Sequence, residues 1–182
     1  MASEEKVLAV SRECIEAFLN AGTLDIGVAE LCRTTGISAR SFHRYFPTKP
    51  QLIRPFFDEM TRTFGERIIN SPLPFEAAAR EAFHVAVLGS LPGRIVDFMR
   101  LLRTREEYWA VFLEVADASE RTHSATLARR LPGLDDDALV VVTAGVVASS
   151  RLALIAGFDG ADPEPKFAAY LHRFMTGYAI TG

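Results

Sequence analysis

Apolar side chains recur every three to four residues along most of the chain, which is the period of amphipathic α-helices. The first such stretch covers residues 4–20, and Gly22 follows it where a helix is expected to stop. A shorter helix is predicted over 27–34, with Asp25 or Gly27 as its N-cap. We therefore expect the chain to open with two helices joined by a short loop.

A third helix is predicted directly after a tight turn. Thr35 and Gly36 form the turn, and Ser38 is a favourable N-cap for a helix that runs to about Tyr45. Pro47 then ends the helix, because proline cannot continue it and restricts the residue before it. The turn, the cap and the proline together define this element more sharply than any other in the sequence.

A fourth helix is predicted to begin at Thr48, because Thr48 and Gln51 have the spacing of a capping box. Pro55 lies about two turns into this helix, where it would remove a backbone hydrogen bond, so we expect a kink or an interruption there. The proline-containing stretch 71–74 is the clearest boundary in the chain.

Helical periodicity continues to the end of the sequence, and no alternating pattern predicts a strand. The further helices are predicted at 75–89, 92–103, 104–115, 117–130, 135–157 and 164–179.

The composition is that of an ordinary soluble globular protein. Hydrophobic residues make up 49% and charged residues 24% of its 182 residues, which is enough to form a substantial core. The longest apolar stretch, 138–150, is shorter than a membrane span, and Glu4 and Glu5 stand where a signal peptide needs positive charge. We therefore expect a cytoplasmic protein with no membrane partner.

Residues suited to metal or redox chemistry are scattered. Cys14 and Cys32 form no CxxC pair, and the histidines occur singly. We expect neither a zinc site nor a disulfide, and we expect both cysteines to be packed in the core. No nucleophile–base pair or phosphate-binding loop occurs at a recognisable spacing, so we expect no catalytic residue, no metal, no cofactor and no enzymatic activity.

Charge is distributed unevenly along the chain. The segment from Arg33 to Arg54 carries five basic residues and no acidic one, although the whole chain has a net charge of −3. A basic patch on an acidic body suits a protein that touches phosphates with one end only. Two helices joined by a tight turn, the second with exposed polar side chains, form a helix-turn-helix that can enter a major groove. A three-helix bundle whose solvent-exposed face is basic fits the same pattern.

In this segment the sequence resembles the N-terminal domain of the TetR family of bacterial transcription regulators. The resemblance extends over about a quarter of the chain, and its most specific residues are Gly36-Ile37-Ser38, Ser41-Phe42-His43-Arg44-Tyr45-Phe46, and Thr48-Lys49 with Leu52. They follow the order and spacing of the family's signature. His43 replaces the family's usual tyrosine, and Gly27 stands where the family often has a threonine that caps the second helix.

The resemblance implies which residues contact DNA. The expected set is Ser38, Arg40, Ser41, His43, Arg44, Tyr45, Thr48 and Lys49. The serines, the histidine and the lysine are expected to bind phosphates, whereas the two arginines reach bases or phosphates. Phe42 and Phe46, four residues apart, are expected to point inward and to hold the third helix on the first two.

A helix-turn-helix binds selectively when it is paired, because a symmetric dimer engages two half-sites about one helical turn apart. The helix predicted over 135–157 is apolar nearly all round, so it needs cover on more than one side. Small residues such as Gly145 permit another helix to approach closely. We therefore expect a homodimer through the 135–157 and 164–179 helices, as the resemblance also implies. A central place in the core of a monomer explains the same pattern.

The middle of the chain is expected to bind a small-molecule effector. The candidate residues are His84, Phe98, Met99, Leu102, Arg105, Trp109, Phe112, His123 and Arg151. Such a lining suits a mostly apolar ligand, with or without an acidic group, although core packing explains each aromatic residue taken alone. Arg151 interrupts an apolar helix, and its charge needs a carboxylate from the protein or from the ligand.

Together these features predict an all-α fold. An N-terminal three-helix helix-turn-helix DNA-binding domain is expected over 1–54, and a C-terminal helical effector-binding and dimerisation domain over 55–182. The expected function is ligand-responsive transcription regulation, by a repressor that a mostly apolar small molecule releases from a palindromic operator in double-stranded DNA. The alternative is a small-molecule-binding helical protein whose DNA-binding function has decayed.

Overall fold

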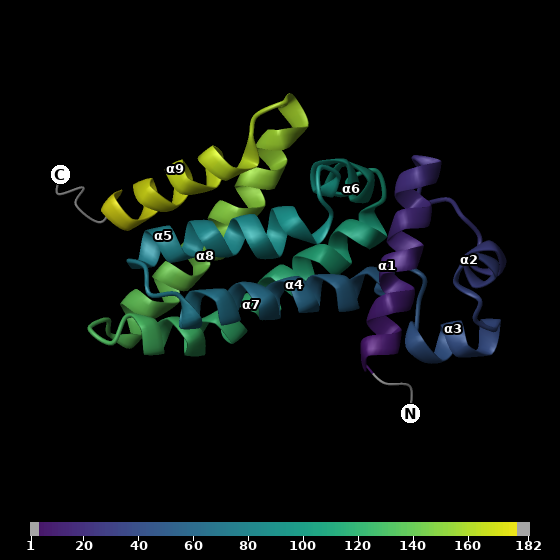
Figure 1. Cartoon of the computed structure of the whole chain (residues 1–182), viewed down its shortest axis with the longest axis horizontal. Helices are drawn as coiled ribbons and strands as arrows, with labels where there is room; N and C mark the ends of the chain where they lie inside the picture. The colour runs from purple at the N-terminus through teal and green to yellow at the C-terminus, as the bar shows by residue number, and fades with distance from the viewer. Residues whose placement is uncertain (1–3, 178–182) are drawn as a thin grey trace. The chain divides into compact units, whose positions relative to one another are not determined.

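The computed structural model describes residues 4–177, and within that range the chain is all-helical, with no strand (Figure 1). The predicted all-α class is therefore confirmed. The α-helices are α1 (Glu4–Ala21), α2 (Val28–Thr35), α3 (Ala39–Tyr45), α4 (Arg54–Asn70), α5 (Phe75–Ala82), α6 (Ile95–Leu102), α7 (Glu106–Arg130), α8 (Asp136–Ala156) and α9 (Pro163–Thr176). The shorter helical turns are η1 (Pro50–Ile53), η2 (Phe83–Val87), η3 (Leu88–Ser90) and η4 (Gly157–Asp159).

The chain forms two compact units that alternate along the sequence. The first unit combines the residues up to Glu59 with Asp97–Val115, and the second combines Met60–Val96 with the residues from Ala116 on. The sequence predicts a single boundary between domains, after residue 54. In the structure the first unit also contains α6 from Asp97 on and the first turns of α7. Helices α4 and α7 therefore supply residues to both units.

Aromatic packing explains why α6 and the start of α7 belong to the first unit. Phe98 of α6 packs against two consecutive rings of the first unit, with ring centroids 5.9 Å from Phe56 and 6.0 Å from Phe57. Tyr108 of α7 meets Phe18 of α1 edge to face at 5.9 Å. Phe18, Phe56 and Phe98 are fully buried. Burial of one such side chain stabilises the fold by about 1.5–3 kcal/mol, so these contacts form a large part of the core.

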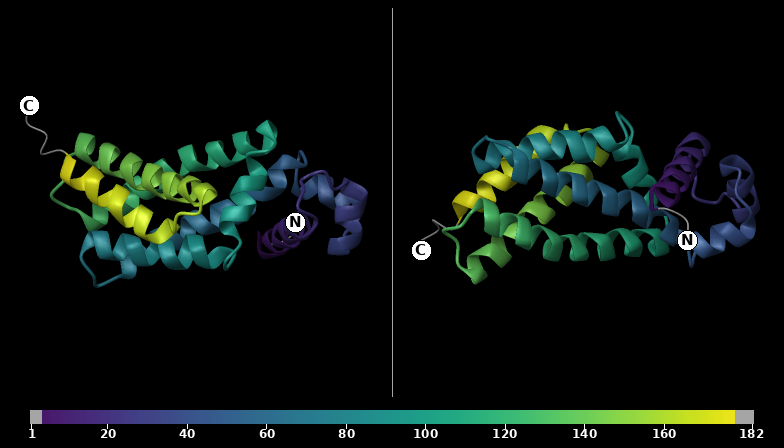
Figure 2. Two further views of the ribbon diagram at one scale, coloured as in Figure 1. Left: turned by 90° about the horizontal axis from the view of Figure 1, so that it is seen from above. Right: turned by 60° about the horizontal axis from the view of Figure 1, so that its bottom comes forward.

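The second unit contains α8 and α9 side by side (Figure 2). Gly145 of α8 makes this close approach possible, because the ring of Phe174 from α9 occupies the space where a Cβ at that position would lie. Elsewhere on α9, Phe167 stacks on Phe83 of η2 with ring centroids 4.4 Å apart. Helix α9 is thus held by α8 and by η2.

Three predicted helices have the wrong boundaries. Residues 106–130 form the single helix α7, not two helices over 104–115 and 117–130, because no glycine or proline lies near Ala116 to end a helix. The helix predicted over 75–89 breaks into α5, the wider π-helical turn η2 and the tighter turn η3. For the helix predicted over 164–179, the last two residues lie outside the described range.

The start of α4 also differs from its prediction. Thr48 and Gln51 form no capping box: no side chain caps η1, and Gln51 Oε1 accepts a hydrogen bond from Arg54 Nε at 2.9 Å. Pro55 is the second residue of α4 and is not two turns inside a helix. A first-turn N–H has no partner within the helix, so proline is tolerated at this position. The interruption expected at Pro55 is provided by η1, just ahead of it.

Candidate functional site

A tight turn at Gly36–Ser38 joins α2 to α3. Gly36 adopts a φ of 65°, and its N–H donates to the Cys32 carbonyl, which ends α2 in a conformation that glycine tolerates best. The Ser38 hydroxyl oxygen then accepts a hydrogen bond from the Ser41 N–H at 3.2 Å. The predicted N-cap is therefore confirmed, and such a cap stabilises a helix by about 1 kcal/mol.

Helix α3 has a buried side and an exposed side. Phe42 and Phe46 have exposed fractions of 0% and 1%, with ring centroids 5.2 Å apart, so the prediction that they point inward is confirmed. Arg40, His43 and Arg44 are exposed. The exposed side is therefore rich in hydrogen-bond donors. Phosphate oxygens and acceptor atoms on the edges of bases can accept hydrogen bonds from such side chains.

Arg44 is held by its neighbours on α3. Its guanidinium lies 5.2 Å from the centroid of the Tyr45 ring and donates to the Ser41 hydroxyl at 3.4 Å and to the Tyr45 hydroxyl at 3.5 Å. Each contact is weak, because both hydrogen bonds are long. Together they restrict the side chain before it meets a partner, which lowers the entropy that binding costs.

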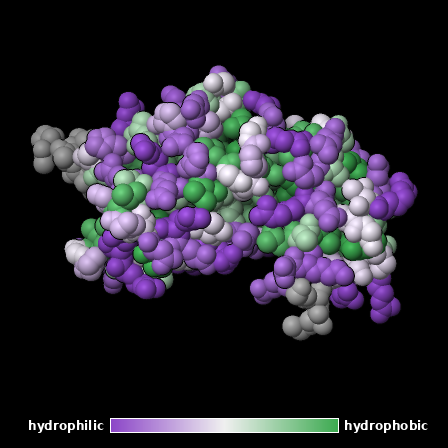
Figure 3. All heavy atoms as spheres, in the orientation of Figure 1, coloured by the Kyte–Doolittle hydropathy of each residue, from purple (hydrophilic) through white to green (hydrophobic). Residues whose placement is uncertain are grey.

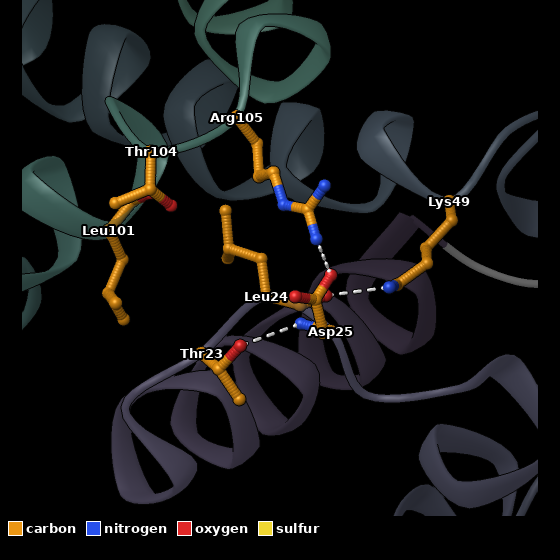
Figure 4. A network of polar contacts seen from close by, with 7 residues as sticks. All are labelled: Thr23, Leu24, Asp25, Lys49, Leu101, Thr104 and Arg105. Carbon is orange, nitrogen blue, oxygen red and sulfur yellow. Dashed lines mark hydrogen bonds and ion pairs between the residues drawn. The ribbon is translucent and has the colours of Figure 1, made fainter.

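Lys49 is engaged inside the first unit (Figure 4). Its Nζ donates to the Leu24 carbonyl at 2.6 Å and lies 5.7 Å from the centroid of the Phe18 ring. Burial lowers the pKa of Lys49, and the nearby carboxylate of Asp25 partly opposes this shift. The ammonium expected to bind a phosphate therefore holds the loop after α1, and it reaches a phosphate only by leaving the Leu24 carbonyl.

An ion pair fixes the same loop to the start of α7 (Figure 4). Arg105, expected as a ligand-binding residue, donates to the carboxylate of Asp25, expected as a helix cap, and this hydrogen bond lowers the pKa of Asp25. Gly27 stands at the N-cap of α2 without a side chain to cap it. The ion pair was not predicted, because 80 positions separate its members and no local pattern links them.

The candidate ligand-binding residues are divided between the two units. Those in the first unit are Phe98, Met99, Leu102, Arg105, Trp109 and Phe112. All but Arg105 and Trp109 are buried, and Phe112 packs against Phe57 with ring centroids 5.1 Å apart. Trp109 is half-buried beneath the guanidinium of Arg103, which lies 4.6 Å from its ring centroid. In this structure these aromatic residues form the packing between α4, α6 and α7.

The remaining candidates, His84, His123 and Arg151, lie in the second unit. His84 is exposed, and its Nδ1 lies 2.8 Å from Glu164 Oε2 of α9. His123 is only 5% exposed and lies beside Phe64, with ring centroids 5.2 Å apart. Arg151 is half-buried on α8, and within residues 4–177 no carboxylate pairs with it. Within residues 4–177, no hydrogen bond, ion pair or ring contact joins any two of these three residues.

Helix α8 keeps part of its apolar surface exposed. Val142 and Val146 are buried, whereas Val140 and Leu152 have exposed fractions of 63% and 45%. The helical stretch Asp136–Asp159 is long and apolar enough to cross a membrane, by length and composition only, which corrects the prediction that the stretch is too short. The buried helix of a soluble protein meets the same criterion, and hydrophilic residues predominate on the face of the molecule that Figure 3 shows.

In the part of the chain that the structure describes, no three His, Cys, Asp or Glu residues gather as metal ligands would. A scan against protein-family models gives no match, and a search of curated proteins gives none.

Proposed function

We propose that this protein is a ligand-responsive, DNA-binding transcription regulator that acts as a repressor. The observation that carries the proposal is α3, a short helix that follows a glycine turn, is capped by Ser38, buries Phe42 and Phe46, and exposes basic side chains. A helix of this kind fits the major groove, where arginine donates to guanine and to phosphates. The resemblance to the TetR family supports the same assignment, because its signature residues are those that build α3.

The proposed DNA contacts fall into two classes. The phosphate contacts come from Ser38, Ser41, His43 and Thr48. Arg40 and Arg44 read the edges of bases, and the Tyr45 ring supports Arg44. Lys49 is the exception among the expected residues, since its Nζ donates to the Leu24 carbonyl. Phosphate contacts contribute affinity for every DNA sequence, whereas base contacts contribute affinity only for the matching sequence. Substitutions in the two classes should therefore change the affinities for operator and for unrelated DNA differently.

The regulator is proposed to act as a homodimer through α8 and α9. Val140 and Leu152 leave apolar surface on α8, and a second copy of the chain would cover it. Such a dimer offers two copies of α3 to the half-sites of a palindromic operator, about one helical turn apart. Sedimentation of the wild-type protein and of Val140→Glu tests this step: a wild-type monomer refutes it.

The effector is proposed to be a mostly apolar small molecule that releases the operator. Helices α4 and α7 supply residues to both units, so a ligand that changes their packing in the second unit acts on elements of the first. Release requires that the ligand bind the DNA-free state more tightly than the DNA-bound state.

Selection of bound sequences from random duplexes by the purified protein tests the proposal. We expect a palindromic operator that is bound with nanomolar affinity and with strong salt dependence. Arg44→Ala should weaken binding to this operator about 5- to 100-fold more than binding to a scrambled duplex, because a bidentate base contact is lost. Thr48→Ala should weaken binding to both duplexes alike, and Arg33→Ala on α2 serves as the matched basic control. Identical effects of the α3 and control variants would refute the role of α3.

A small-molecule-binding protein with a decayed DNA-binding function is the second candidate. Two observations favour it: the ammonium of Lys49 is engaged by Leu24, and Gly27 offers no side chain to cap α2 or to touch DNA. Ligand binding without selection of any DNA sequence in the experiment above would establish this candidate over the first.

A further inference from the structure

Two positively charged side chains meet at Leu24 and Asp25, in the loop between α1 and α2 (Figure 4). We call these two residues the Leu24–Asp25 corner. Lys49, just ahead of η1, donates to the Leu24 carbonyl at 2.6 Å. Arg105, just ahead of α7, donates to the Asp25 carboxylate. The corner and both cations belong to the first unit.

Hydrogen bonds order the backbone on both sides of the ion pair. The Asp25 N–H donates to the Thr23 hydroxyl oxygen at 3.1 Å, within the loop after α1. The Thr104 hydroxyl donates to the Leu101 carbonyl at 2.7 Å, in the turn that carries Arg105. The ion pair therefore joins two segments that are each held by their own contacts.

The place of the Lys49 ammonium is unfavourable for a charge. Burial lowers the pKa of Lys49, because the charged form has lost part of its hydration there. The Leu24 carbonyl accepts one hydrogen bond, and the ring centroids of Phe18 and Tyr108 lie 5.7 Å and 6.0 Å from Nζ. These neutral groups return only part of the lost hydration, so the ammonium depends on negative charge nearby.

Asp25 supplies most of that negative charge. Its carboxylate attracts the Lys49 ammonium more strongly than Glu107 does, whereas the Arg105 guanidinium repels it. Asp25 is thus the counter-ion of two cations, one of which opposes the other. Loss of the Asp25 charge would leave Lys49 part-buried and repelled by Arg105.

We propose that the Leu24–Asp25 corner is an autoinhibitory contact that withholds Lys49 from the phosphates of double-stranded DNA. The role in DNA binding rests on the proposed function, whereas the hold on Lys49 does not. Carbonyl and carboxylate oxygens accept from an ammonium as phosphate oxygens do, so the corner and DNA compete for one side chain. Lys49 follows Thr48, a proposed phosphate contact, so a released ammonium has a phosphate near it.

The two members of the ion pair should differ in effect. Asp25→Asn removes the charge that holds Lys49 and leaves Arg105 to repel it, so Lys49 is released. Arg105→Gln removes the repulsion and leaves the carboxylate to Lys49 alone, so Lys49 stays held. An ion pair that served only to join the two segments would give the same result in both variants, because either substitution breaks it.

Acetylation of the folded protein by an amine-reactive reagent measures the hold on Lys49 without any DNA. The other lysines of the chain, Lys6 and Lys166, are exposed and serve as internal references. In the wild type, Lys49 should react more slowly than both. In Asp25→Asn its rate should rise about two- to fivefold, the range that one exposed charge pair supports. In Arg105→Gln its rate should not rise.

DNA binding at several salt concentrations identifies what the released Lys49 contacts. Each phosphate contact steepens the fall of log K with log salt by about 0.9. Asp25→Asn should show one such increment over the wild type, with the operator and with a scrambled duplex alike. Its gain in affinity should therefore shrink about 3.5-fold as the salt rises from about 50 to about 200 mM. Arg105→Gln should show no increment.

Two controls separate the release of Lys49 from the mere loss of a negative charge. Glu30→Gln removes the same charge from an exposed position on α2, and it should keep the wild-type slope. In the Lys49→Met background, Asp25→Asn has no ammonium to release. The double variant should therefore have the slope of Lys49→Met.

The outcomes distinguish the hold on Lys49 from its role in DNA binding. An unchanged acetylation rate of Lys49 in Asp25→Asn would refute the hold. Faster acetylation with an unchanged slope would overturn the autoinhibitory role, and so would a steeper slope that persists in the double variant. If neither the wild type nor any variant bound DNA, the proposed function would fail and the autoinhibitory role with it, while acetylation would still report the hold.

Discussion

Acid should destabilise this protein through His123. The side chain is almost fully buried, and burial lowers its pKa from 6.5 to about 4. Between these two values the unfolded chain binds a proton that the folded chain excludes, so the free energy of unfolding falls as the pH falls from about 6.5 to about 4. Each pKa unit corresponds to about 1.4 kcal/mol, which gives a loss of about 2.5 kcal/mol between pH 7.5 and 4.5. Above about pH 6.5 the contribution is fully present and constant.

Urea unfolding at pH 7.5 and pH 4.5 measures this loss in the wild type and in His123→Leu. Carboxyl groups also titrate in this window, but both proteins carry them, so the difference between the two losses isolates the histidine. We expect the wild type to lose about 2.5 kcal/mol more than the variant. His84→Leu is the matched control, because His84 is exposed and pairs with Glu164 at the surface. Equal losses in the wild type and in His123→Leu would refute a buried, neutral His123.

Three further substitutions test other parts of the fold. Gly145→Ala should lower the free energy of unfolding by about 1–2 kcal/mol, because the new Cβ displaces the Phe174 ring and the gain in helix propensity offsets only part of this; unchanged urea unfolding would contradict the α8–α9 packing. Ser38→Ala should lower the free energy of unfolding by about 1 kcal/mol through loss of the α3 cap. Circular dichroism during a urea titration measures this loss, and an unchanged free energy of unfolding would contradict the role of the cap. Lys49→Met should lower it by about 1 kcal/mol through loss of the bond to Leu24 and should leave the salt dependence of DNA binding unchanged; a slope of log K against log salt that falls by about 0.9 would instead identify a phosphate contact.

The surroundings of α3 were predictable because every signal there is local. Gly36 tolerates a positive φ, Ser38 carries an oxygen that reaches the N–H of Ser41, and Pro47 cannot continue a helix. The four-residue spacing of Phe42 and Phe46 places both on one side of any helix. None of these properties depends on the rest of the chain, and the predicted bounds of α2 and α3 agree with the structure to within one residue.

Contacts between distant residues could not be predicted in the same way. Asp25 is a residue type that favours helix N-caps, and Arg105 is a residue type that suits a ligand-binding site. Only the fold brings the two into an ion pair. The helical spacing of Phe98 would be the same if the residue packed in either unit. Periodicity therefore does not reveal that Phe98 packs with Phe56 and Phe57 in the first unit. Periodicity indicates which side of a helix is buried, but the partner that buries it is a property of the whole fold.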